Sequence, residues 1–312
     1  MRAITVTSFG EPEVLRATSS HPDPAPQADE LLVKVSHSSI NPIDWKTRRG
    51  LGWGADLIRE RLPWVIGMDV VGEVAGAGAD VDRGKWIGKR VAAFANLRRG
   101  GAHAEYTVVK AAAAAAIPQA VASETAAALP VAGVTSREAL RIAMSHSAPG
   151  AALLVLGATG GMGHITCQLA RPRFNPHAIP RYESDREYLE QLGANIHANH
   201  GQRYAAAIDL VGGDAAIAAL KLLQPGGLMV TVPTITADAV RAAGARAGVK
   251  VEGVFRPDTT SHLGELLDLV AQGRLKIRVD SVYDADDIAA AHRRAEAGGV
   301  RSKIVIAMRW RG

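Results

Sequence analysis

The chain has 312 residues, of which 47% are apolar and 21% charged, a composition typical of a folded globular protein with about two domains. No run of ~18 uncharged apolar residues occurs, and the first residues lack the apolar core of a signal peptide, so we expect a cytoplasmic protein without a membrane span. The net charge of +5 includes no long basic run, which argues against a nucleic-acid partner. The single cysteine, Cys167, excludes an intrachain disulfide and a cysteine-based zinc cluster.

The first part of the chain is predicted to be rich in β-strands. Short apolar stretches at 31–35, 65–74 and 90–94 are separated by Gly and Pro turns. Strands at this spacing predict an irregular barrel or sandwich over roughly the first 120 residues. The alanine run at 111–116 is too short to predict a helix, so we interpret it as a connector.

The pattern changes near Ser123 to alternating helices and strands. A predicted amphipathic helix at 135–147 is followed by the continuous apolar run 151–156, which is typical of a strand buried on both faces of a parallel sheet. Further strands and helices then alternate at 206–211, 215–223, 228–232, 237–247, 249–255 and 260–272. This alternation predicts a doubly wound α/β domain. The last predicted strand, 303–307, is expected to return to the first domain.

A glycine motif follows the buried strand directly and precedes a helix. Gly157 allows a sharp turn, Gly160 lets a pyrophosphate approach the backbone, and Gly163 lets the helix pack closely on the strand. We therefore predict a dinucleotide site here, against the alternative of a purely structural turn. The remaining residues of the predicted cofactor loop are Ala158, Thr159, Gly161 and Met162.

The choice between NADPH and NADH is expected to depend on residues about 20 positions after the motif. Arg181, Ser184 and Arg186 are suited to hold a 2′-phosphate, and we predict NADPH on that basis. Glu183 opposes this interpretation, because a carboxylate at the strand end favours a free 2′-hydroxyl. The alternative is that these residues form only a solvated loop.

Taken in order, the motifs resemble those of the zinc-free quinone oxidoreductase branch (zeta-crystallin-like) of the medium-chain dehydrogenase/reductase superfamily. The similar segments are 40–46, 67–74, 88–91, 101–106, 129–136, 157–163, 192–194, 209–213, 226–227 and 302–305. The resemblance implies a GroES-like domain at 1–122 with 274–312 and a Rossmann domain at 123–273. It also implies a homodimer and NADPH-dependent reduction of a small-molecule quinone or activated C=C bond.

The resemblance also implies positions for the site. Asn41 and Asp44 belong to the motif that lines the substrate cleft of the family, and we predict a catalytic role for them, with turn capping as the alternative. The predicted substrate wall comprises Trp45, Trp64 and Phe94, although tryptophan often serves packing alone. Further cofactor contacts are predicted at Thr135, Val211, Val232, Phe255 and Lys303.

Zinc-dependent relatives carry Cys near the position of Ile43 or Asp44 and His at that of Met68, so no metal is expected. The chain departs from the family at 171–180, where three prolines suit a strand poorly. Two alternatives therefore stay open. One is a redox-silent protein of the same fold that binds NADPH or RNA, and the other is an enone-specific reductase of secondary metabolism.

Overall fold

The structure is a computed structural model, and it describes residues 1–197, 201–254 and 262–311. The chain divides into two compact units, which we call unit 1 and unit 2. Unit 1 comprises residues 1–134 and 258–312, and unit 2 comprises residues 135–257. The helix α5 (Pro130–Met144) begins in unit 1 and continues into unit 2.

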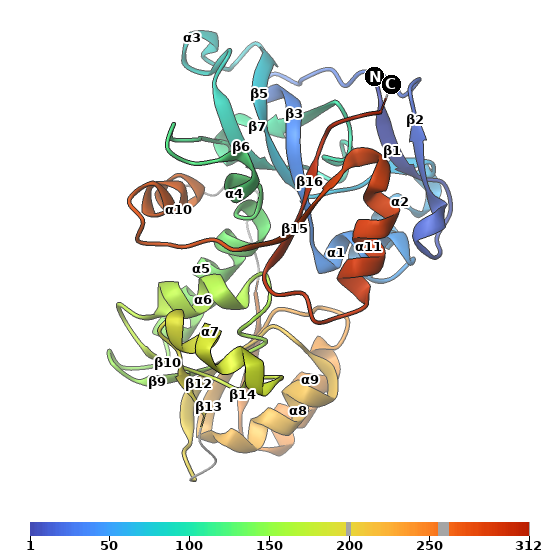
Figure 1. Cartoon of the computed structure of the whole chain (residues 1–312). Helices are drawn as coiled ribbons and strands as arrows, with labels where there is room; N and C mark the ends of the chain where they lie inside the picture. Colours follow the sequence, from blue (N-terminus) through green and yellow to red (C-terminus); the bar gives the residue numbers. More distant parts are fainter. Residues whose placement is uncertain (198–200, 255–261, 312) are drawn as a thin grey trace. The chain divides into compact units, whose positions relative to one another are not determined.

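A mixed sheet forms the centre of unit 1 (Figure 1). Its long strand β3 pairs antiparallel with β5, β7 and β16, and β16 pairs parallel with β15. The strands are β3 (Glu30–Ile40), β5 (Asp69–Ala77), β6 (Arg90–Phe94), β7 (Tyr106–Lys110), β8 (Ala115–Ala116), β15 (Val279–Asp284) and β16 (Lys303–Ala307). The pairing of β16 with β3 confirms that the last strand returns to the first domain.

A smaller sheet and short helices complete unit 1. The small sheet has the order β2-β1-β4, with β1 (Ala3–Val6), β2 (Leu15–Thr18) and β4 (Trp64–Val65). The helices are α1 (Pro42–Arg48), α2 (Gly52–Ile58), α3 (Arg83–Trp86), α4 (Ser123–Ala127), α10 (His262–Ala271) and α11 (Ile288–Glu296).

The division between the units differs from the predicted boundaries after residues 122 and 273. The reason is packing, since α4 lies against β3 and β5, and α10 contacts β8. Both helices therefore belong to unit 1. Their sequences resemble the helical segments of unit 2, which lies between α4 and α10 in the chain.

Unit 2 is a parallel sheet with the order β11-β10-β9-β12-β13-β14. Its strands are β9 (Ala152–Leu156), β10 (Asn175–Ala178), β11 (Asn195–Ile196), β12 (Tyr204–Asp209), β13 (Leu223–Thr231) and β14 (Lys250–Gly253). Its remaining helices are α6 (Gly163–Ala170), α7 (Arg186–Gln191), α8 (Gly213–Ala219) and α9 (Ala237–Arg246).

Both faces of this sheet are buried, as the apolar run 151–156 predicts. Leu153 and Val155 pack in one core with side chains of α5, α6 and α7, whereas Leu154 and Leu156 pack in a second core with α8 and α9. Alternate side chains of one strand thus serve two cores, which explains why β9 contains no polar residue. The doubly wound α/β arrangement is therefore confirmed.

The proline-rich segment forms a strand after all, so our expectation that it suits a strand poorly was wrong. Pro176 lies in β10, which pairs with β9 on one side and β11 on the other. Only one of the three prolines falls inside the four-residue strand. The backbone N–H of the neighbouring Asn175 still donates to the Ala151 carbonyl at 2.9 Å, so the ladder loses a single donor.

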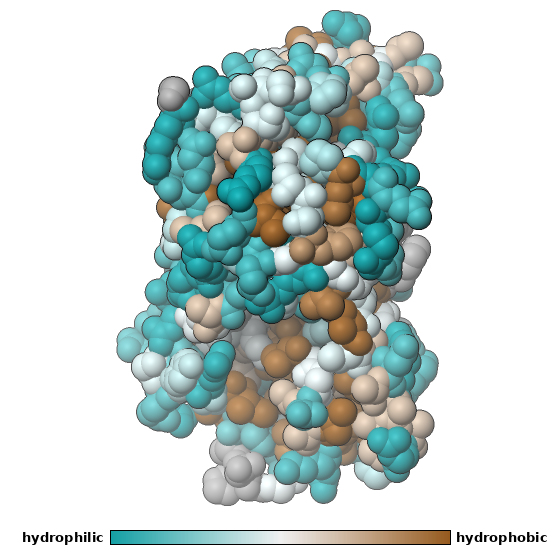
Figure 2. All heavy atoms as spheres, turned by 90° about the vertical axis from the view of Figure 1, so that its right-hand side faces the viewer, coloured by the Kyte–Doolittle hydropathy of each residue, from teal (hydrophilic) through white to brown (hydrophobic). Residues whose placement is uncertain are grey.

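Among the described residues, no helix combines the length and apolar character needed to cross a membrane. The face shown in Figure 2 carries its apolar side chains in separate small patches between hydrophilic ones.

Candidate active site

The glycine loop of unit 2 connects the end of β9 to the start of α6, and its three motif glycines serve different purposes. Gly157 has φ +75°, a conformation that favours glycine. A Cβ at Gly163 would lie 2.1 Å from the carbonyl oxygen of Gly157, so this position requires glycine for close packing. Gly160 has no positive φ, and a Cβ there would lie 3.3 Å from the same oxygen. The fold therefore demands Gly157 and Gly163 more strictly than Gly160.

The other residues of the loop differ in their burial. Thr159, Gly161 and Met162 are partly exposed, whereas Ala158 is buried in the core. Ser136 of α5 donates to the Met162 carbonyl at 3.3 Å and accepts from the Thr166 hydroxyl at 3.0 Å, which fastens the loop to α5 and α6. The sequence did not identify Ser136, but it is the neighbour of the predicted Thr135, which is half-buried.

A buried carboxylate shapes the neighbouring strand ends. One Asp209 oxygen accepts from the backbone N–H groups of Val211 and Gly212 at 2.9 and 2.8 Å, and the other accepts from the Thr231 hydroxyl at 2.7 Å. The Val232 N–H donates to the Asp209 carbonyl at 3.0 Å.

The predicted cofactor residues Val211 and Val232 are thereby held at the carboxyl ends of β12 and β13, the edge on which the glycine loop also lies. Val211 is 52% exposed, and a Cβ at Gly157 would come within 3.0 Å of it. Ligands of doubly wound sheets bind at this edge. The predicted contact Phe255 lies outside the described residues.

The residues that follow β10 are mostly exposed and carry charges of both signs. Arg186 donates to Glu183 at 2.8 Å, and this partner holds the pKa of the Glu183 carboxyl below its ordinary value. Arg181 lies over the Tyr182 ring at 5.3 Å and forms no ion pair within the part of the chain that the structure describes. Glu183 therefore neutralises Arg186. Arg181 is the cation of this segment that remains available to bind an anionic ligand. Ser184 lies between them and is exposed.

Unit 1 contains a cluster of buried polar side chains around Asp69, which we call the Asp69 cluster: Ser39, Asn41, Asp69 and Lys303. One Asp69 oxygen accepts from the Ser39 hydroxyl, from the Asn41 amide at 2.7 Å and from the Lys303 ammonium at 3.2 Å. The other accepts from the Val131 N–H at 2.7 Å, at the start of α5. Asp69 and Ser39 were not identified from the sequence.

Lys303 is 3% exposed, and its ammonium group reaches three acceptors. These are Asp69, the Asn41 amide oxygen at 2.6 Å and the Ile40 carbonyl at 3.2 Å. An ammonium has three N–H bonds, so its donor capacity is filled within unit 1. The sequence predicts a cofactor contact for Lys303, and the structure places its charge inside the Asp69 cluster.

Asn41 and Asp44, the predicted catalytic pair, are both buried at the start of α1. The Asp44 carboxylate accepts from the Asn41 backbone N–H at 2.7 Å, the arrangement of a helix cap. Burial raises the pKa of Asp44 to about 7, and the negative charge of Asp69 acts in the same direction. The geometry thus shows the capping role that was the alternative for this pair, while their part in chemistry stays a prediction.

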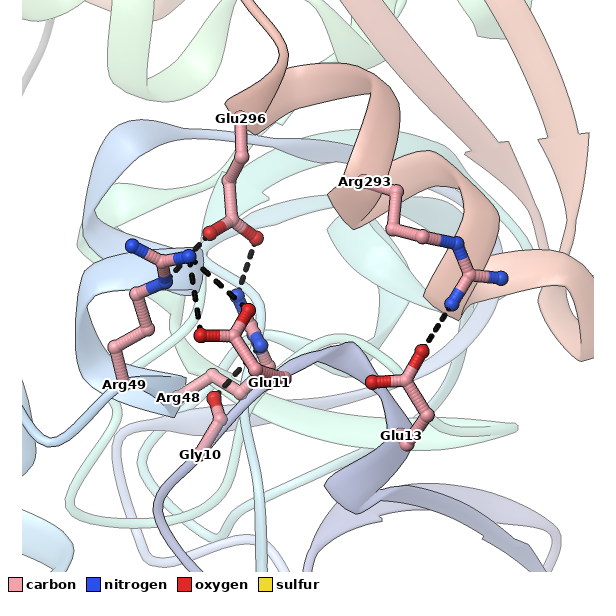
Figure 3. A network of polar contacts seen from close by, with 7 residues as sticks. All are labelled: Gly10, Glu11, Glu13, Arg48, Arg49, Arg293 and Glu296. Atoms are coloured by element: carbon pink, nitrogen blue, oxygen red, sulfur yellow. Dashed lines mark hydrogen bonds and ion pairs between the residues drawn. The ribbon is translucent and has the colours of Figure 1, made fainter.

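The other end of α1 is fastened by charges (Figure 3). The fully buried Arg48 donates to the Gly10 carbonyl at 2.7 Å and pairs with Glu296 at the end of α11. Arg49 pairs with the same Glu296 at 2.6 Å and with Glu11 at 3.0 Å. Both ends of α1 are therefore fixed to segments far away in the sequence.

The predicted aromatic wall is distributed over different surroundings. Trp45 is half-buried on α1, with the Lys46 ammonium 5.4 Å from its ring centroid. Trp64 donates its indole N–H to the Leu97 carbonyl at 2.8 Å, which indicates packing. Phe94 is buried and lies opposite Asp69 in the pairing of β5 with β6. Trp45 and Phe94 therefore belong to a helix and a strand that border the Asp69 cluster.

The residue expected at a zinc-ligand position, Met68, and the single cysteine of the chain are both part of the interior. Met68 packs in the core of unit 1, and Cys167 lies in a core of unit 2, where burial raises the pKa of its thiol to about 12. The described residues include no group of three or more His, Cys, Asp or Glu side chains that is suited to a metal ion.

Two protein families match the chain. The alcohol dehydrogenase GroES-like domain matches residues 27–119, and the zinc-binding dehydrogenase family matches residues 177–306. The two matches agree with the mixed sheet of unit 1 and the parallel sheet of unit 2. They confirm the predicted combination of a GroES-like and a Rossmann domain.

Individual relatives are similar over different lengths. A chloroplastic quinone-oxidoreductase homologue of Spinacia oleracea is 40% identical over 152 residues, which is 47% of this chain and 45% of the relative. The 2-methylene-furan-3-one reductase of Solanum lycopersicum is 30% identical over 98% of this chain and 79% of its own length.

Solved structures are similar over nearly the whole chain. The quinone oxidoreductase of Coxiella burnetii is 31% identical, with a TM-score of 0.92 over 99% of each chain. A mycobacterial protein solved in complex with NADPH is 25% identical, with a TM-score of 0.81 over 98% of this chain and 100% of its own.

Proposed function

Because the chain belongs to the quinone oxidoreductase branch of the medium-chain dehydrogenase/reductase superfamily, we propose that it reduces a quinone or an activated C=C bond with NADPH and without zinc. As a member of this family, the protein is an oxidoreductase with a nicotinamide cofactor. The reductase of tomato and the quinone oxidoreductase of Coxiella support the substrate class.

The observation that carries the proposal is the conformation of Gly160. Its φ is not positive, and a Cβ would meet a single atom, the Gly157 carbonyl oxygen, in a tight contact at 3.3 Å. Glycine avoids this contact, and close approach of a ligand gives a second reason for the missing side chain. A pyrophosphate is such a ligand, because the helix that follows directs the positive end of its dipole toward the loop.

The residues of the chain fit this cofactor. Backbone groups from Gly157 to Gly163 would hold the pyrophosphate, and Val211 and Val232 would line the same sheet edge. Arg181 would pair with the 2′-phosphate, while Glu183 is occupied by Arg186 at 2.8 Å. This occupation supports NADPH over NADH, because the carboxylate that would favour a free ribose hydroxyl already has a partner. The mycobacterial neighbour bound to NADPH supports the same choice.

Bound NADPH supplies a hydride, and the protein supplies orientation. We assign Asn41, Asp44 and Lys303 to positioning, because their polar groups contact one another and Asp69. Together they fix the start of α1, which carries Trp45. The reduced substrate would then take its proton from water. This assignment adds a supporting role to the catalytic role predicted for Asn41 and Asp44.

The test is consumption of NADPH with a panel of quinones and enones, with NADH as the control cofactor and a second series after exhaustive chelation. We expect turnover with NADPH that survives chelation. Loss of activity on removal of stoichiometric zinc would contradict the zinc-independent reaction. Binding of NADPH without turnover on any substrate would support the redox-silent alternative, and turnover of one enone alone would support a specialised reductase.

A further inference from the structure

Two buried side chains of unit 2 form hydrogen bonds with carbonyl oxygens of the glycine loop. His164, in the first turn of α6, is fully buried, and its Nδ1 lies 3.1 Å from the Gly160 carbonyl oxygen. Ser136 of α5 is also fully buried and donates to the Met162 carbonyl at 3.3 Å. Neither residue was among the cofactor contacts predicted from the sequence.

The contact with Gly160 fixes which nitrogen of His164 carries a proton. A carbonyl oxygen can only accept a hydrogen bond, so Nδ1 must be the donor. The backbone N–H of His164 donates to the same oxygen at 3.2 Å, and the backbone N–H of Thr166 donates to the Met162 oxygen at 2.8 Å. Each of the two carbonyls therefore accepts one bond from a backbone N–H and one from a side chain, which uses both of its lone pairs.

These bonds determine which way the peptide groups of the loop face. Both backbone bonds join a residue to the carbonyl four positions earlier, as in an α-helix, so the two carbonyls point along α6 and away from its amino end. In a planar trans peptide the N–H lies opposite the carbonyl, so the N–H groups of Gly161 and Gly163 point out of that end. The positive ends of these two peptides thus face the cofactor edge of the sheet.

We propose that His164 and Ser136 are positioning residues for pyrophosphate binding, an inference that rests on the nucleotide site proposed above. They act through the loop backbone, since each holds one carbonyl in place. A carbonyl that turned toward the ligand would set a partial negative charge against the phosphate oxygens, whereas a fixed one keeps the N–H end of its peptide facing them. Glycine backbone rotates more freely than that of any other residue, so a glycine-rich loop needs such a restraint from its neighbours.

The experiment measures by calorimetry how tightly the full chain binds NADPH and ADP, which carries a pyrophosphate without the nicotinamide. His164→Leu puts a methyl group in the place of Nδ1, and we expect both ligands to bind about three- to tenfold more weakly. His164→Asn keeps a donor at the same number of bonds from Cα and should bind like the parent. Gln168→Leu is the matched control, because the Gln168 amide donates at 2.9 Å to the His164 carbonyl, which lies in α6 outside the loop.

Parent-like binding of both ligands by His164→Leu overturns the proposal. A loss that His164→Asn shares or that Gln168→Leu reproduces also overturns it, because the loss then reflects the stability of α6. So does a loss for NADPH alone, or a parent that binds neither ligand.

Thermal unfolding shows whether each variant is folded. If His164→Leu is not, Ser136→Ala tests the same proposal at the Met162 carbonyl, where a comparable loss supports it and unchanged binding overturns it. Turnover is measured separately. Binding with the expected losses but without reduction of any quinone or enone contradicts the proposed reductase and leaves the positioning role intact.

Discussion

The glycine loop of unit 2 and the Asp69 cluster of unit 1 use polar groups in opposite ways. In the loop, Gly160 is partly exposed, carries no side chain and has its own N–H and carbonyl bonded to Gly157 and His164. In the cluster, the Lys303 ammonium fills its donors with acceptors of unit 1, and each Asp69 oxygen has at least one donor. The loop thus offers a partly exposed surface at the sheet edge, whereas the polar groups of the cluster are buried and filled by one another. Dense burial of paired charge indicates structural support, and the partly exposed loop is where we expect the ligand.

The largest effect is expected from breaking the cluster by Lys303→Met. The substitution keeps the length of the side chain but leaves the Asp69 carboxylate buried without its cation, which costs about 3–5 kcal/mol of unfolding free energy. Chemical denaturation measures it. Lys250→Met is the control, because Lys250 is 62% exposed and paired only at the surface. The double variant Lys303→Met/Asp69→Asn should recover part of the loss, and no recovery would mean that packing rather than charge matters.

The glycine loop is tested by Gly160→Val. Because φ is not positive there, the variant should stay folded, while its branched side chain occupies the space of the pyrophosphate. The parent should gain about 2.7 kcal/mol of stability at an NADPH concentration of 100 times the dissociation constant, and the variant should gain none. Thermal unfolding with and without NADPH measures both. A variant that keeps the full shift would show that the nucleotide binds elsewhere.

A smaller effect is expected at the 2′-phosphate. Arg181→Ala should weaken the binding of NADPH by about 1.5–3 kcal/mol and leave the binding of NADH nearly unchanged. Arg186→Ala serves as the comparison, since Arg186 is paired with Glu183 at 2.8 Å and should contribute less. Isothermal titration with both cofactors gives the four values. Equal losses for NADPH and NADH in Arg181→Ala would remove the assignment.

The stability of the protein should also depend on pH through Asp44. Asp44 has a pKa of about 7 in the folded protein, above the ordinary value of 3.8, so the unfolded chain loses this proton first as pH rises. Stability should therefore fall between about pH 4 and pH 7 and level off above. Asp44→Asn keeps an acceptor for the Asn41 N–H and should flatten this decline. An unchanged slope would assign the pH dependence to other groups.

The features that the sequence predicted correctly are those with local signals. These signals are contiguous in the sequence: the apolar run 151–156, the three glycines after it, and the alternation of strands and helices that follows. The structure has the parallel sheet that they indicate. The carboxyl ends of β12 and β13 could be placed beside the loop for the same reason. Pro176 was misjudged because a short strand tolerates one missing donor when its neighbours keep theirs.

The Asp69 cluster could not be predicted in this way, because its members come from distant parts of the chain. Asp69 and Lys303 are 234 residues apart and meet only when β16 pairs with β3. An aspartate in the largely apolar stretch 65–74, which also contains Glu73, was the one available signal. The role of Lys303 was assigned from family resemblance, which gives a position but not the partners that fill its donors.

The place of β16 in the sheet also affects how the protein is made. Lys303 follows Ile40 by 263 residues, and β16 lies between β3 and β15. At about 5–20 residues per second, the ribosome needs roughly 15–50 s to supply this strand after β3 has emerged. Unit 2, which is continuous from 135 to 257, can complete its sheet in the meantime. During synthesis, residues 37–40 of β3 therefore lack this partner for tens of seconds, a period in which chaperones would protect them from association with other chains.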